Sequence, residues 1–486
     1  MTLLQLAAEC GASLRGDPRI EVTGVSHRSA QVRPGEVFAA LPGLRRHGVE
    51  FTVEARARGA VAVLSDRDPG PGVSWLAADD PRRSAALAAW ALAGHPHRRL
   101  RMIGVTGTNG KSTVVDLISR IAAEAGERPG TFGTLGYALP HRSEAAARTT
   151  PEAPDLAPLL RELVDHGGTS AVMEVSSHAL EQRRVAGLAF DVAVWTNLTR
   201  DHLDFHRDLD DYFAVKASLA DLLRPQPPGR RVIGADDPTM ARLLADRRAG
   251  DLTFGLGAGR DVTASSPALS LQGTSFVLST PIGEAEVTLP LIGRHNLRNA
   301  LAAAAASAAA GWPLDAIARG LGGARPLPGR LEPVEVPGVP SFVDYAHTPD
   351  ALEQVVGALR ELSDRRLIVV FGCGGDRDPG KRGPMGEVVG RLADVPIVTS
   401  DNPRSEPPDA IIAAVMEGVR ASGNPRALAI SDRREAIGAA LSTADDRSVV
   451  LVAGKGHETE QVFADRAVEF DDRQVLRELG RKRRNP

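Results

Sequence analysis

Short apolar runs alternate with longer amphipathic stretches along most of the chain. The runs at residues 171–175, 192–196 and 449–453 have the length of buried strands and are too short for helices. Residues 81–92 and 410–420 instead have helical patterns, the first of them rich in alanine. Strands that alternate with helices predict an α/β fold built on parallel sheets.

Three units are expected from the 486 residues, because one domain usually takes about 150 residues. The first boundary lies where residues 95–97, His-Pro-His, break a helix ahead of a new strand. The second lies in the Pro- and Gly-rich segment 324–329, which has the composition of a linker. The predicted domains are therefore residues 1–98, 99–327 and 328–486.

Composition excludes several classes of protein. Hydrophobic residues make up 43% and charged residues 24% of the chain, and the net charge is −3, which argues against a disordered chain and a nucleic-acid binder. Cys10 and Cys373 are too few for a disulfide framework and suit a reducing compartment. Residues 1–13 lack the features of a signal peptide, and the alanine run 300–310 is too short to span a bilayer. We expect a cytoplasmic monomer with neither a nucleic-acid nor a membrane partner.

Lysine is rare in this chain, since only five of the 58 basic residues are lysines and the other 53 are arginines. A position that needs a compact ammonium, or a nitrogen that can lose its proton, cannot use arginine. Lys111, Lys216 and Lys455 all lie in or near the motifs described below. We therefore expect a chemical reason for each of them.

A glycine-rich turn follows the strand expected at residues 101–105 and leads into an amphipathic helix. Residues 106–113 read Thr-Gly-Thr-Asn-Gly-Lys-Ser-Thr. The glycines would let backbone N–H groups converge on a polyphosphate, Lys111 would reach its terminal phosphates, and Ser112 would ligate magnesium. The strict pattern has glycine six positions before the lysine, where this chain has Val105. A plain turn between strand and helix is the weaker interpretation, so the segment predicts binding of a nucleoside triphosphate.

Groups that could bind a metal follow the next two expected strands. Glu174 lies near the carboxyl end of the strand at 171–175, where α/β sheets bind ligands, and could hold magnesium. Residues 197–206 are dense in side chains that bind metals or phosphate, although a solvated loop is an equally good interpretation. Lys216 follows on a predicted helix, and alone it would be read as a surface lysine.

Charged loops directly follow three expected strands of the last unit. Their sequences are Gly-Cys-Gly-Gly-Asp-Arg-Asp at 372–378, Ser-Asp-Asn-Pro-Arg at 400–404 and Gly-Lys-Gly-His-Glu at 454–458. Ligands of open parallel sheets bind beyond the carboxyl ends of the strands, so these loops should converge on one crevice. Arginine takes a carboxylate bidentately and Asp or Glu takes an ammonium, which makes an amino acid the expected ligand. Taken singly, each loop could equally be an ordinary polar turn.

In this order the motifs resemble those of the Mur ligase family, and of its MurE type in particular. The matching segments are residues 104–113, 149–151, 174–178, 201–206, 293–299, 344–350, 401–404 and 454–458. With a weaker match at 37–43, the resemblance covers essentially the whole chain. It implies a small N-terminal α/β domain that binds uridine, a central ATPase domain with a phosphate loop on a parallel sheet, and a Rossmann-like C-terminal α/β domain.

The resemblance implies an ATP-dependent ligase that adds the third residue of the peptidoglycan stem peptide to UDP-MurNAc-L-Ala-D-Glu. A carboxylate is a poor electrophile for an amine, so ATP would phosphorylate it and phosphate would leave as the amide forms. The positions implied for ATP are Gly107, Thr108, Asn109, Gly110, Lys111, Ser112, Thr113, Asn296, Arg330 and Asp344.

The resemblance also implies a catalytic set with two magnesium sites. Its catalytic members are Lys111, Glu174, His202 and Lys216, and its metal ligands are Ser112, Glu174, His202 and a carbamylated Lys216. A carbamate requires a neutral amine that captures carbon dioxide, which arginine cannot offer.

Two further sets of residues match the family's substrate positions. The set for the UDP-muramoyl dipeptide is His27, Thr149, Thr150, Ser176, Gln182 and Arg184. The chain departs from the family there, with Ser-His-Arg at 26–28 for the usual Asp-Ser-Arg and Arg148 for an asparagine. The set for the incoming amino acid is Arg377, Asp401, Asn402, Pro403, Arg404, Gly454 and Glu458.

The Asp-Asn-Pro-Arg motif resembles the version that selects meso-diaminopimelate, whose second carboxylate Arg404 would take. L-Ornithine and L-lysine, which have only an ammonium at that end, stay alternatives. Folylpolyglutamate synthase shares the phosphate loop and the carbamate lysine, but the separate N-terminal unit and this motif disfavour it. A P-loop kinase or NTPase would release ADP without an amine acceptor, and a UDP-sugar-binding scaffold would not need Lys111, Lys216 and Lys455.

Overall fold

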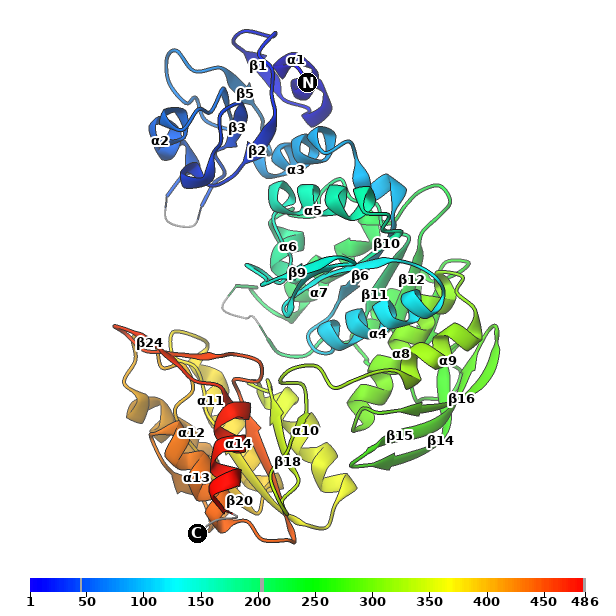
Figure 1. Ribbon diagram of the computed structural model, residues 1–486, viewed down its shortest axis with the longest axis vertical. Helices are drawn as coiled ribbons and strands as arrows, with labels where there is room; N and C mark the ends of the chain where they lie inside the picture. Colours follow the sequence, from blue (N-terminus) through cyan, green and yellow to red (C-terminus); the bar gives the residue numbers. More distant parts are fainter. Residues whose placement is uncertain (44–45, 202–204, 484–486) are drawn as a thin grey trace.

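A computed structural model describes residues 1–43, 46–201 and 205–483. It confirms the α/β fold class, with three sheet-based units arranged along the long axis of the molecule (Figure 1). The strands that the apolar runs predict are present, with ends that differ by at most two residues. The large sheets are mainly parallel, as expected, and each of them also has antiparallel pairing at one edge.

The N-terminal unit is a sheet of order β1-β5-β4-β3-β2, in which only β1 runs antiparallel. Its strands are β1 Ser13–Arg15, β2 Gly24–Ser26, β3 Glu36–Ala39, β4 Ala62–Ser65 and β5 Trp75–Ala77, and its helices are α1 Leu3–Cys10, α2 Thr52–Ala57 and α3 Pro81–Leu92. Asp80 caps α3 by accepting from the Arg83 N–H, and Pro81 occupies the first turn, where no N–H is needed. Helix α3 packs on the central unit, as Figure 1 shows.

The central unit is built on a sheet of order β13-β12-β11-β6-β10-β7-β8-β9. Its strands are β6 Arg101–Thr106, β7 Pro129–Gly133, β8 Gly136–Leu139, β9 Arg142–Glu144, β10 Ser170–Glu174, β11 Val192–Trp195, β12 Arg230–Gly234 and β13 Leu252–Phe254. The pleat of β6 sends Ile103 and Val105 into one core and Met102 into the other, so both faces of the sheet are covered.

Helices cover both faces of this sheet. They are α4 Lys111–Glu124, α8 Arg294–Ala309 and α9 Leu314–Gly322 on one face, and α5 Ala153–Asp165, α6 Ser177–Glu181 and α7 Leu209–Ala217 on the other. The alanine run lies in α8, where small side chains allow close packing against several elements at once. In the described part of the chain, no helix has both the length and the apolar character needed to cross a bilayer.

A three-stranded antiparallel sheet packs beside α9 and α8. It comprises β14 Thr263–Ser270, β15 Gly273–Thr280 and β16 Gly283–Leu289. Its inner face contributes Phe276, Leu278 and Val287 to the core around α8.

The C-terminal unit has a sheet of order β17-β18-β22-β19-β20-β21, with only β17 antiparallel. Its strands are β17 Glu332–Val334, β18 Ser341–Asp344, β19 Arg366–Phe371, β20 Val395–Val398, β21 Leu428–Ala429 and β22 Ser448–Ala453, with a hairpin of β23 Glu460–Val462 and β24 Ala467–Glu469. Its helices are α10 Pro349–Leu362, α11 Arg382–Leu392 and α12 Pro408–Ala421 on one face, and α13 Arg433–Thr443 and α14 Asp472–Arg483 on the other.

Candidate active site

The glycine-rich turn joins β6 to α4 in a conformation that needs its glycines. Gly107 has φ +145° and Gly110 has φ +87°, in the region that side chains disfavour. A Cβ at Gly107 would overlap Thr196 Oγ1, and one at Gly110 would overlap Asn299 Oδ1. The turn therefore packs closely against the end of β11 and against α8, and it leads into the N-terminus of α4, an arrangement that suits a polyphosphate.

Lys111 is the first residue of α4, and its ammonium folds back over the turn. Nζ donates to Gly107 O at 2.9 Å and to Thr108 O at 2.8 Å. Burial lowers the pKa of Lys111, and the carboxylate of Glu174 partly opposes this shift. The ammonium is thus held at the place where a terminal phosphate would lie against the turn.

Ser112 and Glu174 supply adjacent oxygen atoms beside the turn. Ser112 Oγ donates to Glu174 Oε1 at 2.8 Å, and the Thr134 N–H donates to the same oxygen at 2.8 Å. Glu174 is almost fully buried at the end of β10. A hydroxyl and a carboxylate are the ligands that Mg²⁺ prefers, in company with phosphate oxygens, so these two residues fit a magnesium ion.

His202, expected as a further magnesium ligand, lies outside the described residues. Within residues 1–43, 46–201 and 205–483, no group of three or more His, Cys, Asp and Glu side chains has the arrangement of a metal site. The fit to magnesium therefore rests on Ser112 and Glu174.

Lys216 is buried, against the expectation for a lone lysine. It lies on α7 with an exposed fraction of 1%, and Nζ donates to Gly107 O at 2.9 Å. Burial and the nearby charge of Lys111 lower the pKa of Lys216 well below its usual range, which favours the neutral amine. A neutral amine beside the phosphate turn fits the chemistry of carbamate formation.

A cavity of about 580 Å³ lies between the central and C-terminal units. All the residues expected for ATP except Gly107 line it, namely Thr108, Asn109, Gly110, Lys111, Ser112, Thr113, Asn296, Arg330 and Asp344. Thr149 and Ser176, expected to bind the dipeptide, line it as well. The structure thus brings the phosphate turn, the magnesium pair and part of the dipeptide set to one cavity.

The C-terminal wall of the cavity is shaped by Asp344 and Arg330. The Asp344 carboxylate accepts from the N–H groups of Leu331 at 2.6 Å and Ala346 at 2.7 Å. Burial nevertheless raises the pKa of Asp344 to about 6. The Arg330 guanidinium lies over the ring of Tyr345, 5.0 Å from its centroid. A planar cation and a carboxylate are thus fixed opposite the phosphate turn.

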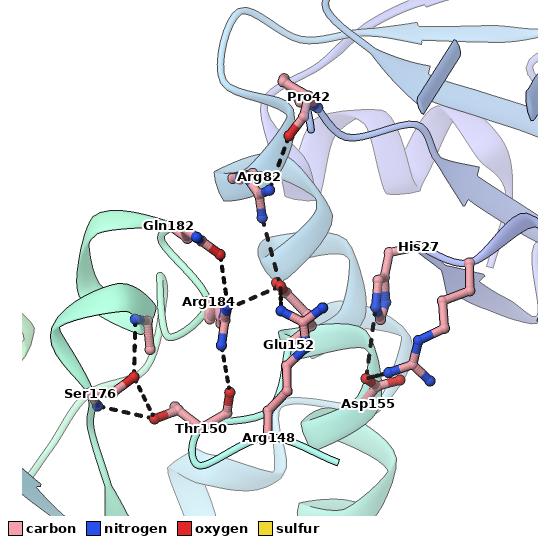
Figure 2. Close-up of polar contacts among 12 residues, drawn as sticks. His27, Pro42, Arg82, Arg148, Thr150, Glu152, Asp155, Ser176, Gln182 and Arg184 are labelled. Atoms are coloured by element: carbon pink, nitrogen blue, oxygen red, sulfur yellow. Dashed lines mark hydrogen bonds and ion pairs between the residues drawn. The ribbon is translucent and has the colours of Figure 1, made fainter. Parts of the chain in front are cut away.

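Four of the dipeptide residues form a hydrogen-bonded cluster at the boundary with the N-terminal unit (Figure 2). Thr150 Oγ1 accepts from the Ser176 N–H at 3.1 Å. Arg184 donates from Nη1 to Thr150 O at 3.2 Å and from Nη2 to Gln182 Oε1 at 2.7 Å. The sequence-predicted residues Thr150, Ser176, Gln182 and Arg184 therefore lie together.

Glu152 is the residue of this cluster that the sequence analysis missed. Its Oε1 lies 3.1 Å from Arg184 Nε, 3.2 Å from Arg148 Nη1 and 3.7 Å from Arg82 Nη1 (Figure 2). Arg82 comes from α3 of the N-terminal unit and also donates to Pro42 O at 3.1 Å. One carboxylate among three guanidinium groups leaves a net positive charge at this boundary, which suits an acidic substrate.

His27 reaches the same boundary from the N-terminal unit. Its Nε2 lies 3.9 Å from Asp155 Oδ2, which also accepts from Arg28 Nη2 at 2.9 Å. Burial lowers the pKa of His27 to about 4, so the imidazole is neutral near pH 7. The basic neighbours Arg28, Arg148 and Arg82 favour the same neutral form.

The three charged loops of the C-terminal unit converge, as expected. Gly375 N donates to Asn402 O at 2.9 Å, and Asn402 Nδ2 donates to Glu458 Oε2 at 2.7 Å. A Cβ at Gly454, which has φ +115°, would overlap Asp401 Oδ2. Loops 372–378, 400–404 and 454–458 therefore form one surface at the carboxyl ends of β19, β20 and β22.

Arginines flank this surface. Arg404 has φ +51° and donates from Nη1 to Gly375 O at 2.7 Å, whereas the Arg377 side chain is exposed. Pro403 is buried between Asn402 and Arg404. Among the described residues, none of the amino-acid set lines the cavity that holds the phosphate turn. Arg200 of the central unit lies 3.7 Å from Asp378 in loop 372–378.

Comparisons with known proteins agree with this geometry. Three family models match: the Mur ligase middle domain at residues 105–307, the Mur ligase glutamate ligase domain at 329–456, and the Mur ligase family catalytic domain at 21–95. The UDP-N-acetylmuramoyl-L-alanyl-D-glutamate–2,6-diaminopimelate ligase of Geobacter metallireducens is 44% identical over 98% of this chain and 97% of its own length.

Solved structures show the same fold. A structure of a UDP-N-acetylmuramoyl-L-alanyl-D-glutamate–2,6-diaminopimelate ligase matches with a TM-score of 0.69 and 33% identity over 100% of both chains. A Mycobacterium tuberculosis folylpolyglutamate synthase matches with a TM-score of 0.63 and 22% identity over 76% of this chain and 91% of its own, which shows a shared fold alone.

Proposed function

This chain belongs to the Mur ligase family, and from that membership we propose that it is the ATP-dependent ligase that joins meso-diaminopimelate to UDP-MurNAc-L-Ala-D-Glu. The observation that carries the proposal is the shared cavity, because Lys111 and Ser112 line it together with Thr149 and Ser176. A triphosphate on the turn and a carboxylate on the dipeptide residues would meet there.

The reaction has two steps, phosphorylation of the carboxylate and formation of the amide. An oxygen of the dipeptide carboxylate attacks the γ-phosphorus of ATP and releases ADP, which gives an acyl phosphate. The free amine of the diamino acid then attacks the acyl carbon, a proton is lost from its nitrogen, and phosphate leaves with the carboxylate oxygen. Lys111 neutralises charge on the transferring group, and the N–H groups at the N-terminus of α4 hold the β-phosphate.

Magnesium would be held by Ser112 and Glu174, with His202 as a further ligand, and would supply charge neutralisation between phosphate oxygens. The oxygen donors of Ser112 and Glu174 support this assignment. A carbamylated Lys216 would give a second magnesium site a carboxylate ligand. Its support is the burial of Lys216 and its contact with Gly107 O.

The loops of the C-terminal unit would bind the amine substrate. Glu458 and Asp401 suit its ammonium groups, while Arg404 and Arg377 suit its carboxylates. Diaminopimelate has a zwitterion at its distal end, so a guanidinium there gains a partner that lysine or ornithine cannot provide. The name of the relative from Geobacter metallireducens supports the same choice.

The C-terminal unit would rotate toward the central unit during the reaction. The support is that the residues expected to bind the amine lie outside the shared cavity, while Gly329 in the linker touches loop 454–458. Gly329, with φ +64°, approaches Gly456 and His457 so closely that a Cβ would overlap both.

The division into residues 1–98, 99–327 and 328–486 is part of this proposal, as are a monomeric state and a cytoplasmic location.

A phosphate-release panel tests the function. ATP, UDP-MurNAc-L-Ala-D-Glu and each of diaminopimelate, ornithine and lysine are supplied together, and each substrate is also omitted in turn. The proposal predicts rapid phosphate release only when all three are present, with diaminopimelate as the preferred amine. Steady phosphate release from ATP alone would instead indicate a P-loop NTPase.

A further inference from the structure

Lys455 is one of the largest fully buried side chains of the protein, with an exposed fraction of 0%. It lies in loop 454–458, directly after β22, beneath the surface formed by the three C-terminal loops. A side chain with no exposed surface does not touch a substrate that binds on that surface. Burying a cation is costly unless oxygen atoms surround it, so its partners indicate what it does.

The ammonium of Lys455 has three oxygen partners. Nζ donates to Asn402 Oδ1 at 3.2 Å, to Glu458 Oε2 at 3.2 Å, and to the backbone oxygen of Glu460. An ammonium carries three N–H donors and no acceptor, so each donor finds one oxygen. A guanidinium has five donors in a planar fork and would leave some of them unpaired in this space. This match explains why a chain so rich in arginine has a lysine at position 455.

Two of the three partners are residues assigned to the amine pocket. Asn402 Nδ2 also donates to Glu458 Oε2 at 2.7 Å, so that Lys455, Asn402 and Glu458 form a closed triangle of hydrogen bonds. Both bonds to the Glu458 carboxylate use Oε2, which leaves Oε1 for an incoming ammonium. The triangle fixes the side-chain torsions of Glu458. Together with the Val462 N–H, which donates to Asn402 Oδ1 at 2.9 Å, it also fixes which way the Asn402 amide faces.

The backbone beneath the triangle is held by a second buried cation. Arg433 and Asp472 form an ion pair with exposed fractions of 0%, and Arg433 Nη2 also donates to Ala453 O at 2.9 Å. Arg433 Nη1 reaches Ser400 O at 3.4 Å. Ser400 begins loop 400–404 and Ala453 directly precedes loop 454–458, so the backbone on which Lys455 finds its partners is also held by contacts that do not involve Lys455.

We propose that Lys455 is a positioning residue for the amine substrate, which acts by holding Glu458 and Asn402 in the orientation that receives an ammonium group. The inference rests on the proposed function and adds to it a residue that touches no substrate. Loss of Lys455 would weaken binding of the amine and leave the ATP-dependent activation of the carboxylate intact. A residue that only stabilised the fold would affect both steps.

The test compares Lys455→Met, which removes the charge and the donors, with Lys455→Gln, which keeps donors without the charge. Lys482→Met, on the exposed end of α14, is the control. Steady-state assays give KM for diaminopimelate and for ATP. Positional isotope exchange in ATP, measured with the dipeptide but without amine, reports acyl phosphate formation. Circular dichroism and thermal unfolding check the fold.

The proposal predicts that KM for diaminopimelate rises about tenfold to a hundredfold in Lys455→Met, because the lost hydrogen bonds involve charged groups. KM for ATP and the rate of isotope exchange should change less than about threefold, and Lys455→Gln should lie between Lys455→Met and the wild type. An unchanged KM for diaminopimelate, equal losses in both assays, or failure of both variants to fold would overturn it. A wild-type enzyme without amine-dependent phosphate release would overturn the proposed function itself.

Discussion

Asn109 donates a hydrogen bond from Nδ2 to Oδ2 of Asp350 at 2.8 Å, which joins the phosphate turn to helix α10 of the C-terminal unit. Thr199 Oγ1 donates to the same oxygen at 3.2 Å and Gln354 Nε2 at 2.9 Å. Burial raises the pKa of Asp350. One carboxylate thus connects the turn, the loop after β11 and α10, so the position of the C-terminal unit is coupled to the ATP site.

A double-mutant cycle tests this coupling. Asn109→Ala and Asp350→Ala should each raise KM for ATP by about tenfold, since each removes a hydrogen bond to a charged group. The double variant should resemble either single variant, because both remove the same bond. Glu361→Ala is the matched control, since Glu361 joins Arg294 at 2.8 Å across the same two units at the surface. Fully additive effects would contradict the coupling.

Lys216→Ala should lower kcat by at least about a hundredfold, because the carboxylate for a second magnesium is lost. Short carboxylates such as formate or acetate should restore part of the activity to this variant and none to Lys111→Ala. The carbamate itself is observable by carbon NMR after growth or incubation with labelled bicarbonate. An unmodified Lys216 in a fully active sample would refute the carbamate.

Arg404→Ala should change the choice of amine. Its kcat/KM for diaminopimelate should fall by about a hundredfold, since a bidentate contact with the distal carboxylate is lost, while that for lysine should change little. Arg391→Ala serves as the control, since Arg391 pairs with Glu353 at the surface of the same unit. Equal losses for both amines would deny Arg404 a selective role.

His27 predicts a pH dependence of stability. Its pKa is lowered from 6.5 to about 4 by burial, so between these values the unfolded chain binds a proton that the folded chain does not. The free energy of unfolding should therefore fall as pH falls from 6.5 to 4, with a contribution from His27 of up to about 3 kcal/mol. Urea unfolding at several pH values should show a smaller fall for His27→Gln. If the free energy of unfolding fell equally with pH in the wild type and in His27→Gln, the fold would not lower the pKa of His27.

The phosphate turn and the strand-end loops were predictable because their signals are local. Residues 106–113 contain the whole turn, and the loops at 400–404 and 454–458 follow directly from the carboxyl ends of apolar runs. The burial of Lys216 was not predictable from its helix, in which the apolar residues do not gather on one face. The contact with Gly107 that buries it joins segments 109 residues apart.

Contacts between distant segments account for what was missed. Glu152 follows a recognised Thr-Thr-Pro segment, but only its partner Arg148 is close in sequence, whereas Arg82 and Arg184 come from separate parts of the chain. Asp350 lies in the recognised motif at residues 344–350, but the sequence gives it no role. Its contact with Asn109 depends on how the two units pack in the fold. The strands β14–β16 are rich in Ala, Ser, Thr and Gly, so their apolar pattern was too weak to predict a sheet.

The central claim is that ATP activates the dipeptide carboxylate in the cavity between the central and C-terminal units before the amine attacks it. The most direct test uses UDP-MurNAc-L-Ala-D-Glu whose reacting carboxylate carries oxygen-18, with ATP and diaminopimelate, and analyses the released phosphate by mass spectrometry. The account predicts that one labelled oxygen passes to phosphate for each amide formed. Amide formation with unlabelled phosphate would contradict it.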